Sequence, residues 1–164
     1  SRYHGLVDLK LKVPGKVAQI QAQKEVAMPR PVPIPDEVSK PFWEAANERR
    51  LTVQRCTTCD RMQYPPEARC FQCNSAENLE WSAVSGRGTI DDYVVVYDSR
   101  LRMFQAEQPY NVAIVQIEED PDIQFFSNLP GTPVDEVPVG ASVEVVFVAS
   151  AAPGQLIPEW RVVH

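Results

Sequence analysis

The hydrophobic and polar positions of this chain alternate with a period of two along most of its C-terminal half. Short alternating runs of this kind are typical of half-buried β-strands. Gly and Pro turn signals separate the runs, for example Asp120-Pro121 and Pro153-Gly154. The pattern predicts strands over residues 79–84, 88–97, 110–117, 123–128, 142–149 and 157–163. Strands of this length and spacing form a sandwich or a small barrel, so we expect a mainly β fold.

A short helix is expected before these strands, because the hydrophobic period changes there to that of an amphipathic helix. The residues at this spacing are Phe42, Ala45, Ala46 and Arg49. Ser39 occupies the position of an N-cap, and Pro41 suits the first turn. A further strand is expected over residues 51–55, directly after the helix.

The first 35 residues form a separate segment. Two alternating runs, 9–13 and 18–22, flank Pro14-Gly15 and predict a β-hairpin, with a helix over 16–27 as the alternative. Five prolines between Met28 and Phe42 then favour an extended, polyproline-like spacer. We therefore expect three parts: residues 1–35 as hairpin and linker, 36–80 as helix and metal site, and 81–164 as barrel.

Composition and charge narrow the class of protein. The 164 residues are 44% hydrophobic and carry a net charge of −6, which excludes wholesale disorder. The longest apolar run falls far short of a membrane span, and no signal peptide is recognisable, so a cytoplasmic protein is expected. Twelve Lys and Arg against eight Asp and Glu give +4 for residues 1–69, and four against fourteen give −10 for 70–164. A start at Ser1 suggests an excised module.

All four cysteines belong to one pattern, in which two pairs of spacing C-x2-C are separated by ten residues. The residues are Cys56, Cys59, Cys70 and Cys73. Each pair can place two thiolates on one side of a tight turn, and two pairs complete a tetrahedron around Zn²⁺. A rubredoxin-type iron and a redox dithiol are the alternatives. Four thiolates leave no open coordination position, so a structural role is expected.

Arginines surround the cysteines in the sequence, at positions 49, 50, 55, 61 and 69. They compensate the charge of a four-thiolate metal site, or they form a patch that binds an anion or a partner. We favour compensation.

Residues suited to catalysis are scarce. The two histidines, His4 and His164, stand near the chain ends, which argues against a His-activated nucleophile. Gly86-Arg87-Gly88 opens a strand instead of a helix and so is not a phosphate loop. Its glycines are expected to mark a bulge where two backbones approach each other.

Several local motifs together resemble the acyl-CoA-associated OB-fold family, classed as domain of unknown function 35. They include Phe42-Trp43, the four cysteines, Tyr64-Pro65-Pro66, Trp81, the run 85–89, Pro109-Tyr110, Asn128-Leu129, Val139-Gly140 and the run 143–147. The resemblance covers about residues 36–163. It implies an N-terminal helical arm, a rubredoxin-like zinc ribbon and a C-terminal OB-fold barrel, with no catalytic residue on this chain.

The resemblance also implies a function. Members of this family accompany thiolase-like enzymes, so we expect an accessory subunit that binds such an aldolase or condensing enzyme and helps it handle acyl-CoA. Some members follow an enoyl-CoA hydratase domain in bacterial steroid side-chain degradation, and residues 6–28 resemble the end of such a domain. Because thiolase-like enzymes are usually dimers, a heterotetramer with two copies of each chain is expected.

Candidate contact residues follow from this expectation. A CoA site needs cations and an aromatic or apolar surface, and the candidates are Arg87, Arg100, Arg102 and Phe104. Phe42, Trp43 and Tyr64 are candidates for contacts with the partner enzyme.

Single-stranded nucleic acid is the alternative ligand, because zinc ribbons and OB barrels also bind it through stacking aromatics. The acidic C-terminal part would repel phosphates, so we expect no nucleic-acid binding.

Overall fold

The computed structural model describes residues 30–163, so the expected hairpin over 9–22 and its helical alternative lie outside the described residues. Residues 31–36 contain neither helix nor strand, as the alternating prolines predict. This arm is attached to the barrel at its start. Arg30 forms an isolated parallel bridge with Ser150, and the N–H of Ala151 donates to the carbonyl of Arg30 at 3.0 Å.

The predicted helix is present as α2 (Lys40–Asn47), with Pro41 in its first turn and Phe42, Ala45 and Ala46 buried. Two details differ from the prediction. The Ser39 side chain does not cap the helix, because Asp36 accepts hydrogen bonds from the Ser39 hydroxyl and N–H. Arg49 lies beyond the helix with φ of 60°, a left-handed conformation that ends the helical path.

The cysteines lie in a small three-stranded antiparallel sheet with the order β2-β1-β3. The strands are β1 (Thr52–Cys56), β2 (Met62–Gln63) and β3 (Leu79–Ala83). Two of these match predicted strands, whereas β2 has only two residues and carries no periodic signal. The expected division between residues 80 and 81 falls inside β3.

The remaining strands form a five-stranded antiparallel sheet with the order β6-β5-β4-β7-β8, curled into a nearly closed barrel. They are β4 (Arg87–Val96), β5 (Tyr110–Ile117), β6 (Gln124–Ser127), β7 (Ser142–Ala149) and β8 (Leu156–Val162). Each coincides with a predicted strand to within one or two residues. A 3-10 turn, η1 (Arg102–Phe104), lies in the loop between β4 and β5. The strict alternation of buried and half-buried residues in β5 shows why its period is so clear.

The first and last strands of the five-stranded sheet meet at a seam that closes the barrel. The N–H of Trp160 in β8 donates to the Ser127 hydroxyl of β6 at 3.2 Å. Curling of the sheet also requires the backbones of β4 and β5 to approach each other closely. A Cβ on Gly88 would clash with the carbonyl oxygen of Gln116 in β5. The close approach expected at Gly88 is therefore present, although the irregularity between β4 and β5 lies between Ile90 and Asp92.

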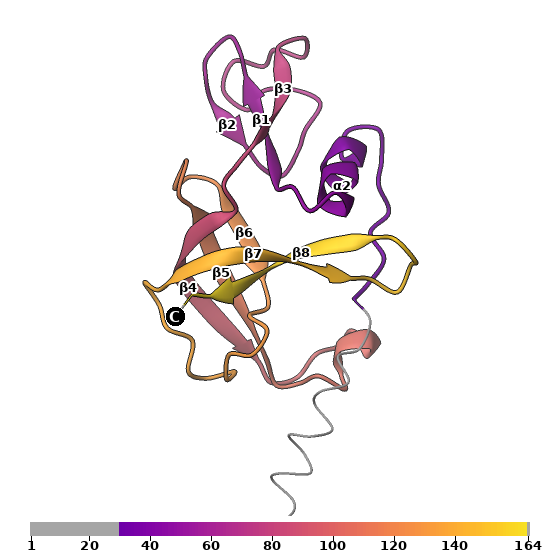
Figure 1. The fold of residues 1–164 in the computed structure, drawn as a ribbon, viewed down its shortest axis with the longest axis vertical. Helices are drawn as coiled ribbons and strands as arrows, with labels where there is room; N and C mark the ends of the chain where they lie inside the picture. Colours follow the sequence, from indigo (N-terminus) through magenta and orange to yellow (C-terminus); the bar gives the residue numbers. More distant parts are fainter. Residues whose placement is uncertain (1–29, 164) are drawn as a thin grey trace, which may run out of the picture.

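Aromatic side chains connect the ribbon to the barrel through one continuous core. Figure 1 shows the ribbon sheet at one end of the molecule, the barrel below it, and α2 beside β8. Phe42 of α2 packs on Tyr64 of the ribbon with ring centroids 5.5 Å apart. Tyr64 stacks on Phe125 of β6 at 4.1 Å, and Phe125 contacts Trp160 at 5.8 Å. The two modules therefore share one hydrophobic core.

Candidate metal centre and barrel seam

The four cysteine sulfurs converge at one point of the ribbon. Cys56 ends β1, Cys59 and Cys73 lie in turns, and Cys70 directly precedes the turn that holds Cys73. All four Sγ atoms lie within 4.8 Å of one another. The Sγ atoms of Cys56 and Cys73 are 3.5 Å apart, and those of Cys59 and Cys70 are 3.6 Å apart. A tetrahedral zinc site with Zn–S bonds of about 2.3 Å has edges of about 3.8 Å, so this donor set fits the ion.

Backbone N–H groups prepare two of the sulfurs for metal binding. Hydrogen bonding from the N–H of Cys59 lowers the pKa of Cys56 to about 6. Hydrogen bonding from the N–H of Cys73 lowers the pKa of Cys70 in the same way, and the Gln72 N–H lies 3.4 Å from the Cys70 sulfur. Thiolates, not thiols, bind the metal, so these turns favour the ligand form at Cys56 and Cys70. Desolvation and the neighbouring sulfurs raise the pKa of Cys59 to about 12, and they also raise the pKa of Cys73. The geometry supports a metal site of structural type.

Four of the five arginines near the cysteines have partners within the chain. Arg50 pairs with Glu48, Arg55 with Asp60, and Arg61 lies 3.8 Å from Asp122. The Arg69 guanidinium donates to the Asn74 carbonyl at 3.0 Å. These carboxylate partners do not favour an anion-binding patch.

The candidate CoA residues do not converge on one site. Arg87 begins β4 and pairs with Glu118 at 3.0 Å. Arg100, Arg102 and Phe104 lie beyond the other end of this ten-residue strand, which spans about 30 Å at about 3.3 Å per residue. Only Arg100, Arg102 and Phe104 share one loop. The predicted strand over residues 88–97 already separates Arg87 from the other three candidates, because they lie beyond opposite ends of one strand.

A pocket of about 150 Å³ opens at the barrel seam, beside this loop. Phe104 of η1 lines it together with apolar residues of β5, β6 and β8. The other lining residues are Arg30, Val112, Phe126, Ser127, Asn128, Ile157, Pro158 and Glu159. Small-molecule sites are typically about 300–1,000 Å³, so this pocket is too small to hold a whole acyl-CoA.

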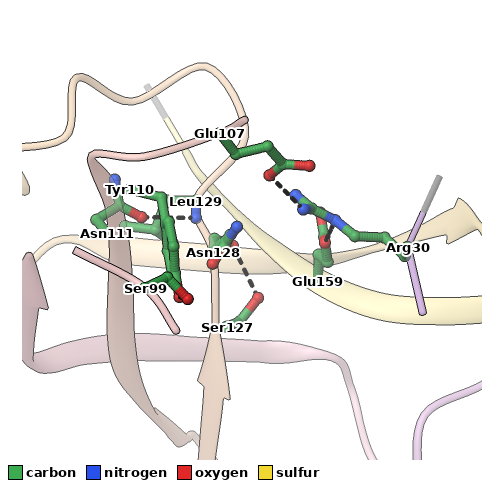
Figure 2. A network of polar contacts seen from close by, with 9 residues as sticks. All are labelled: Arg30, Ser99, Glu107, Tyr110, Asn111, Ser127, Asn128, Leu129 and Glu159. Carbon is green, nitrogen blue, oxygen red and sulfur yellow. Dashed lines mark hydrogen bonds and ion pairs between the residues drawn. The ribbon is translucent and has the colours of Figure 1, made fainter. Parts of the chain in front are cut away.

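One wall of the pocket carries a polar network that joins the arm to three parts of the barrel (Figure 2). The Arg30 guanidinium pairs with Glu107 at 2.8 Å and with Glu159 of β8. With its amide oriented to satisfy both groups, Asn128 accepts from Arg30 at 3.3 Å and donates to the Asn111 carbonyl at 2.9 Å. Burial raises the pKa of Glu159, and the charge of Arg30 opposes that shift.

Sequence reasoning missed this network because its members are far apart in the chain. Arg30 and Glu159 are separated by 129 positions, and neither belongs to a local motif. One signal was available, since Glu159 is the one charged residue in the segment Leu156–Trp160. A carboxylate in a buried strand position requires a partner.

The three candidate partner residues lie at the junction of α2 and the ribbon. Phe42 is 2% exposed, and its side chain packs within the chain. Trp43 contacts Phe42 edge-on at 5.0 Å and is half-buried, as is Tyr64, whose pKa burial raises to about 12. Their contact with a partner stays a prediction.

Comparisons with known proteins agree with this architecture. Residues 43–80 match the family described as the ChsH2 rubredoxin-like zinc ribbon domain, and residues 81–148 match the ChsH2 C-terminal OB-fold domain. The chain belongs to the DUF35 family, in its ChsH2 form. All four cysteines lie in the zinc-ribbon match, whereas β8 and Arg30 lie outside both matched ranges.

Similar proteins give further context. A probable enoyl-CoA hydratase alpha subunit of Thermomonospora curvata is 32% identical over 90% of this chain, which spans only 44% of that protein. A DUF35 domain-containing scaffold protein of Methanocaldococcus jannaschii is 28% identical, with 64% of this chain and 73% of that protein covered. A solved structure described as "Ltp2-ChsH2(DUF35) aldolase" is 29% identical with a TM-score of 0.69, covering 80% of this chain and 98% of that chain.

No helix among the described residues of this DUF35 chain is long and apolar enough to cross a membrane. Both histidines, His4 and His164, lie outside the described residues.

Proposed function

We propose that this chain is a non-catalytic accessory subunit that binds a thiolase-like aldolase or condensing enzyme and supports its handling of acyl-CoA thioesters. The observation that carries the proposal is the likeness to the chain of the Ltp2-ChsH2(DUF35) aldolase, of which 98% is covered. The scaffold designation of the Methanocaldococcus jannaschii relative supports the same role. A steroid side-chain substrate is the finer proposal, suggested by the sequence resemblance.

The chemistry of the chain supports a role without catalysis. The metal site consists of four cysteines, and a four-thiolate zinc ion supplies structural stabilisation and no position for a substrate. The seam pocket is smaller than a CoA thioester, so most of the substrate would bind to the partner enzyme. We propose that Arg100, Arg102 and Phe104 contact the CoA moiety at the edge of that site. Arg87, at the other end of β4, lies away from them.

Stoichiometry and location follow from the proposed partner. Thiolase-like enzymes are usually dimers, so we propose two copies of each chain in the complex. We also propose a cytoplasmic location, where reduced cysteines persist as metal ligands.

An activity assay tests this function directly. The thiolase-like subunit from the same organism is purified and assayed for retro-aldol cleavage of an acyl-CoA substrate, alone and with this chain added in equal amount. We expect cleavage that depends on the added chain, and no cleavage by this chain alone. Equal activity with and without the chain would remove the accessory role.

A further inference from the structure

Two buried glutamines face each other inside the zinc ribbon. Gln54 of β1 is 6% exposed and Gln63 of β2 is 1% exposed, and they are directly opposite in the strand register. Burial of a side-chain amide is unfavourable unless its donors and acceptor find partners. Here five hydrogen bonds provide these partners, and four of them go to one backbone segment, residues 67–71, that contains the first cysteine of the second pair.

Gln63 holds the peptide groups on both sides of a metal ligand. Its Nε2 donates to the carbonyl of Arg69 at 3.1 Å, and its Oε1 accepts from the N–H of Phe71 at 2.9 Å. Cys70 stands between these two residues. The amide therefore restrains the backbone that directs the Cys70 sulfur toward the other ligands.

Gln54 supports the same segment three residues earlier. Its Nε2 donates to the Glu67 carbonyl at 3.0 Å, and its Oε1 accepts from the Glu67 N–H at 2.9 Å. The two amides are joined, since Gln63 Nε2 donates to Gln54 Oε1 at 2.8 Å. Residues 64–71 contain no strand, so side-chain amides take the place of sheet pairing for this backbone.

We propose that Gln54 and Gln63 are positioning residues of the metal centre, which hold the second cysteine pair at coordination distance from the first. Gln54 and Cys56 lie two positions apart on β1 and so share one face of the strand. β1 thus carries one metal ligand and, through the glutamines, orients the segment that carries Cys70. Without the amides, metal binding itself would have to order this segment, and the metal ion would be released faster.

If the two glutamines had a purely structural role, their loss would lower the stability of the protein without a specific effect on metal release. Asn111 offers a matched control for this alternative. Its buried amide in the barrel accepts from the Leu129 N–H at 3.1 Å and donates to the Thr132 carbonyl at 3.5 Å. Asn111→Leu therefore removes a buried amide of the same kind, outside the ribbon. Any general effect of losing buried hydrogen bonds should appear in this variant as well.

The experiment compares the full chain with its Gln63→Met, Gln54→Met and Asn111→Leu variants. Zinc-loaded proteins are mixed with excess chromogenic chelator to measure the rate of zinc release, and cobalt-substituted proteins are examined by visible absorption. Changes to residues that orient metal ligands typically alter metal affinity by about 10–100-fold. We expect an increase of that order in the release rate of Gln63→Met, with altered cobalt bands. The effect of Gln54→Met should be smaller, because Gln63 keeps its contacts with Arg69 and Phe71.

Asn111→Leu should release zinc at the wild-type rate and keep the wild-type cobalt spectrum. Wild-type release from Gln63→Met, or equal acceleration in Asn111→Leu, would overturn the proposal. If Gln63→Met does not fold, Gln54→Met decides: faster release than from Asn111→Leu supports the proposal, and equal release refutes it.

Discussion

Glu159 is a carboxylate in the interior of the barrel wall, and Arg30 is its cationic partner. The Glu159 side chain is 8% exposed, and burial raises its pKa. A group whose pKa is higher in the folded than in the unfolded state stabilises the fold below its unfolded pKa, and this contribution is lost as the pH rises through the folded pKa. Arg30 opposes the shift by stabilising the charged form.

Replacement of Arg30 should therefore destabilise the protein in a pH-dependent manner. In Arg30→Met, the Glu159 charge loses its partner, and breaking a buried pair costs about 3–5 kcal/mol. The free energy of unfolding, measured with urea from pH 5.5 to 8, should fall further below the wild-type value as the pH rises. At each pH the unfolding free energy of the variant is compared with that of wild-type protein, so the titration of all other groups cancels in the difference.

Arg50→Met is the matched control, because it removes an exposed pair with Glu48. Exposed pairs contribute about 0–1 kcal/mol, so this variant should remain close to wild type at every pH. A deficit in Arg30→Met that does not change with pH would contradict the assignment to Glu159.

Single residues differ in how far the sequence revealed them. The cysteines were recognisable because metal ligands follow a local spacing rule. Arg30, Glu107 and Glu159 meet only through the folding of the barrel, and no spacing rule joins them. The Gln54–Gln63 pair was missed for a similar reason, since β2 is too short to have a period.

At the level of elements, the strands were predictable because a barrel strand buries one face in the core and leaves the other closer to solvent. β5, in which buried and half-buried residues alternate strictly, matches its predicted bounds for this reason. The helix and its start were also predictable, since Ser39 is the N-cap residue and the helix begins at Lys40, but the Ser39 hydroxyl donates to Asp36 and makes no capping hydrogen bond. Local propensity cannot choose between competing hydrogen-bond partners of one hydroxyl.

The ribbon should depend on its metal. We expect Cys59→Ser to lose zinc and to lose the dispersed amide signals of β1, β2 and β3 in ¹H–¹⁵N spectra, because structural zinc contributes about 10–16 kcal/mol in small peptides. Zinc added to chelator-treated wild-type protein should restore these signals. Persistence of the β1–β3 signals in zinc-free protein would contradict a structural role for the site.

The aromatic junction should couple the ribbon to the barrel. Tyr64→Ala removes the ring that stacks on Phe125, and loss of a large core side chain costs about 3–5 kcal/mol. Calorimetry should show a lower melting temperature and separate transitions for the two modules. Tyr97→Ala, which removes a ring that is 69% exposed, should melt like wild type. A single transition at the wild-type temperature in Tyr64→Ala would show that the junction does not couple the modules.

For the whole molecule, the distribution of charge limits the choice of partner. Residues 81–164 contain four basic and twelve acidic residues, and Glu107 and Glu159 lie at the barrel seam. Neutralisation of phosphates supplies most non-specific affinity for nucleic acid, so this surface disfavours it. We expect no shift of a single-stranded oligonucleotide in a gel at low salt, where electrostatic binding is strongest. A shift that weakens with added salt would revive the nucleic-acid alternative.

The sequence indicated the modules but not how they are joined. The proline-rich segment was expected to act only as a spacer, yet its first described residue, Arg30, is bonded to the β4–β5 loop, to β8 and to the β7–β8 loop. Such long-range contacts depend on where the folded strands place their ends.

Sedimentation analysis of a mixture with the thiolase-like subunit tests the central claim most directly. The purified chain and the purified subunit are mixed in equal amounts and compared with each protein alone. The account predicts one species whose mass equals two copies of each chain. Two separate species with the masses of the unmixed proteins would contradict it.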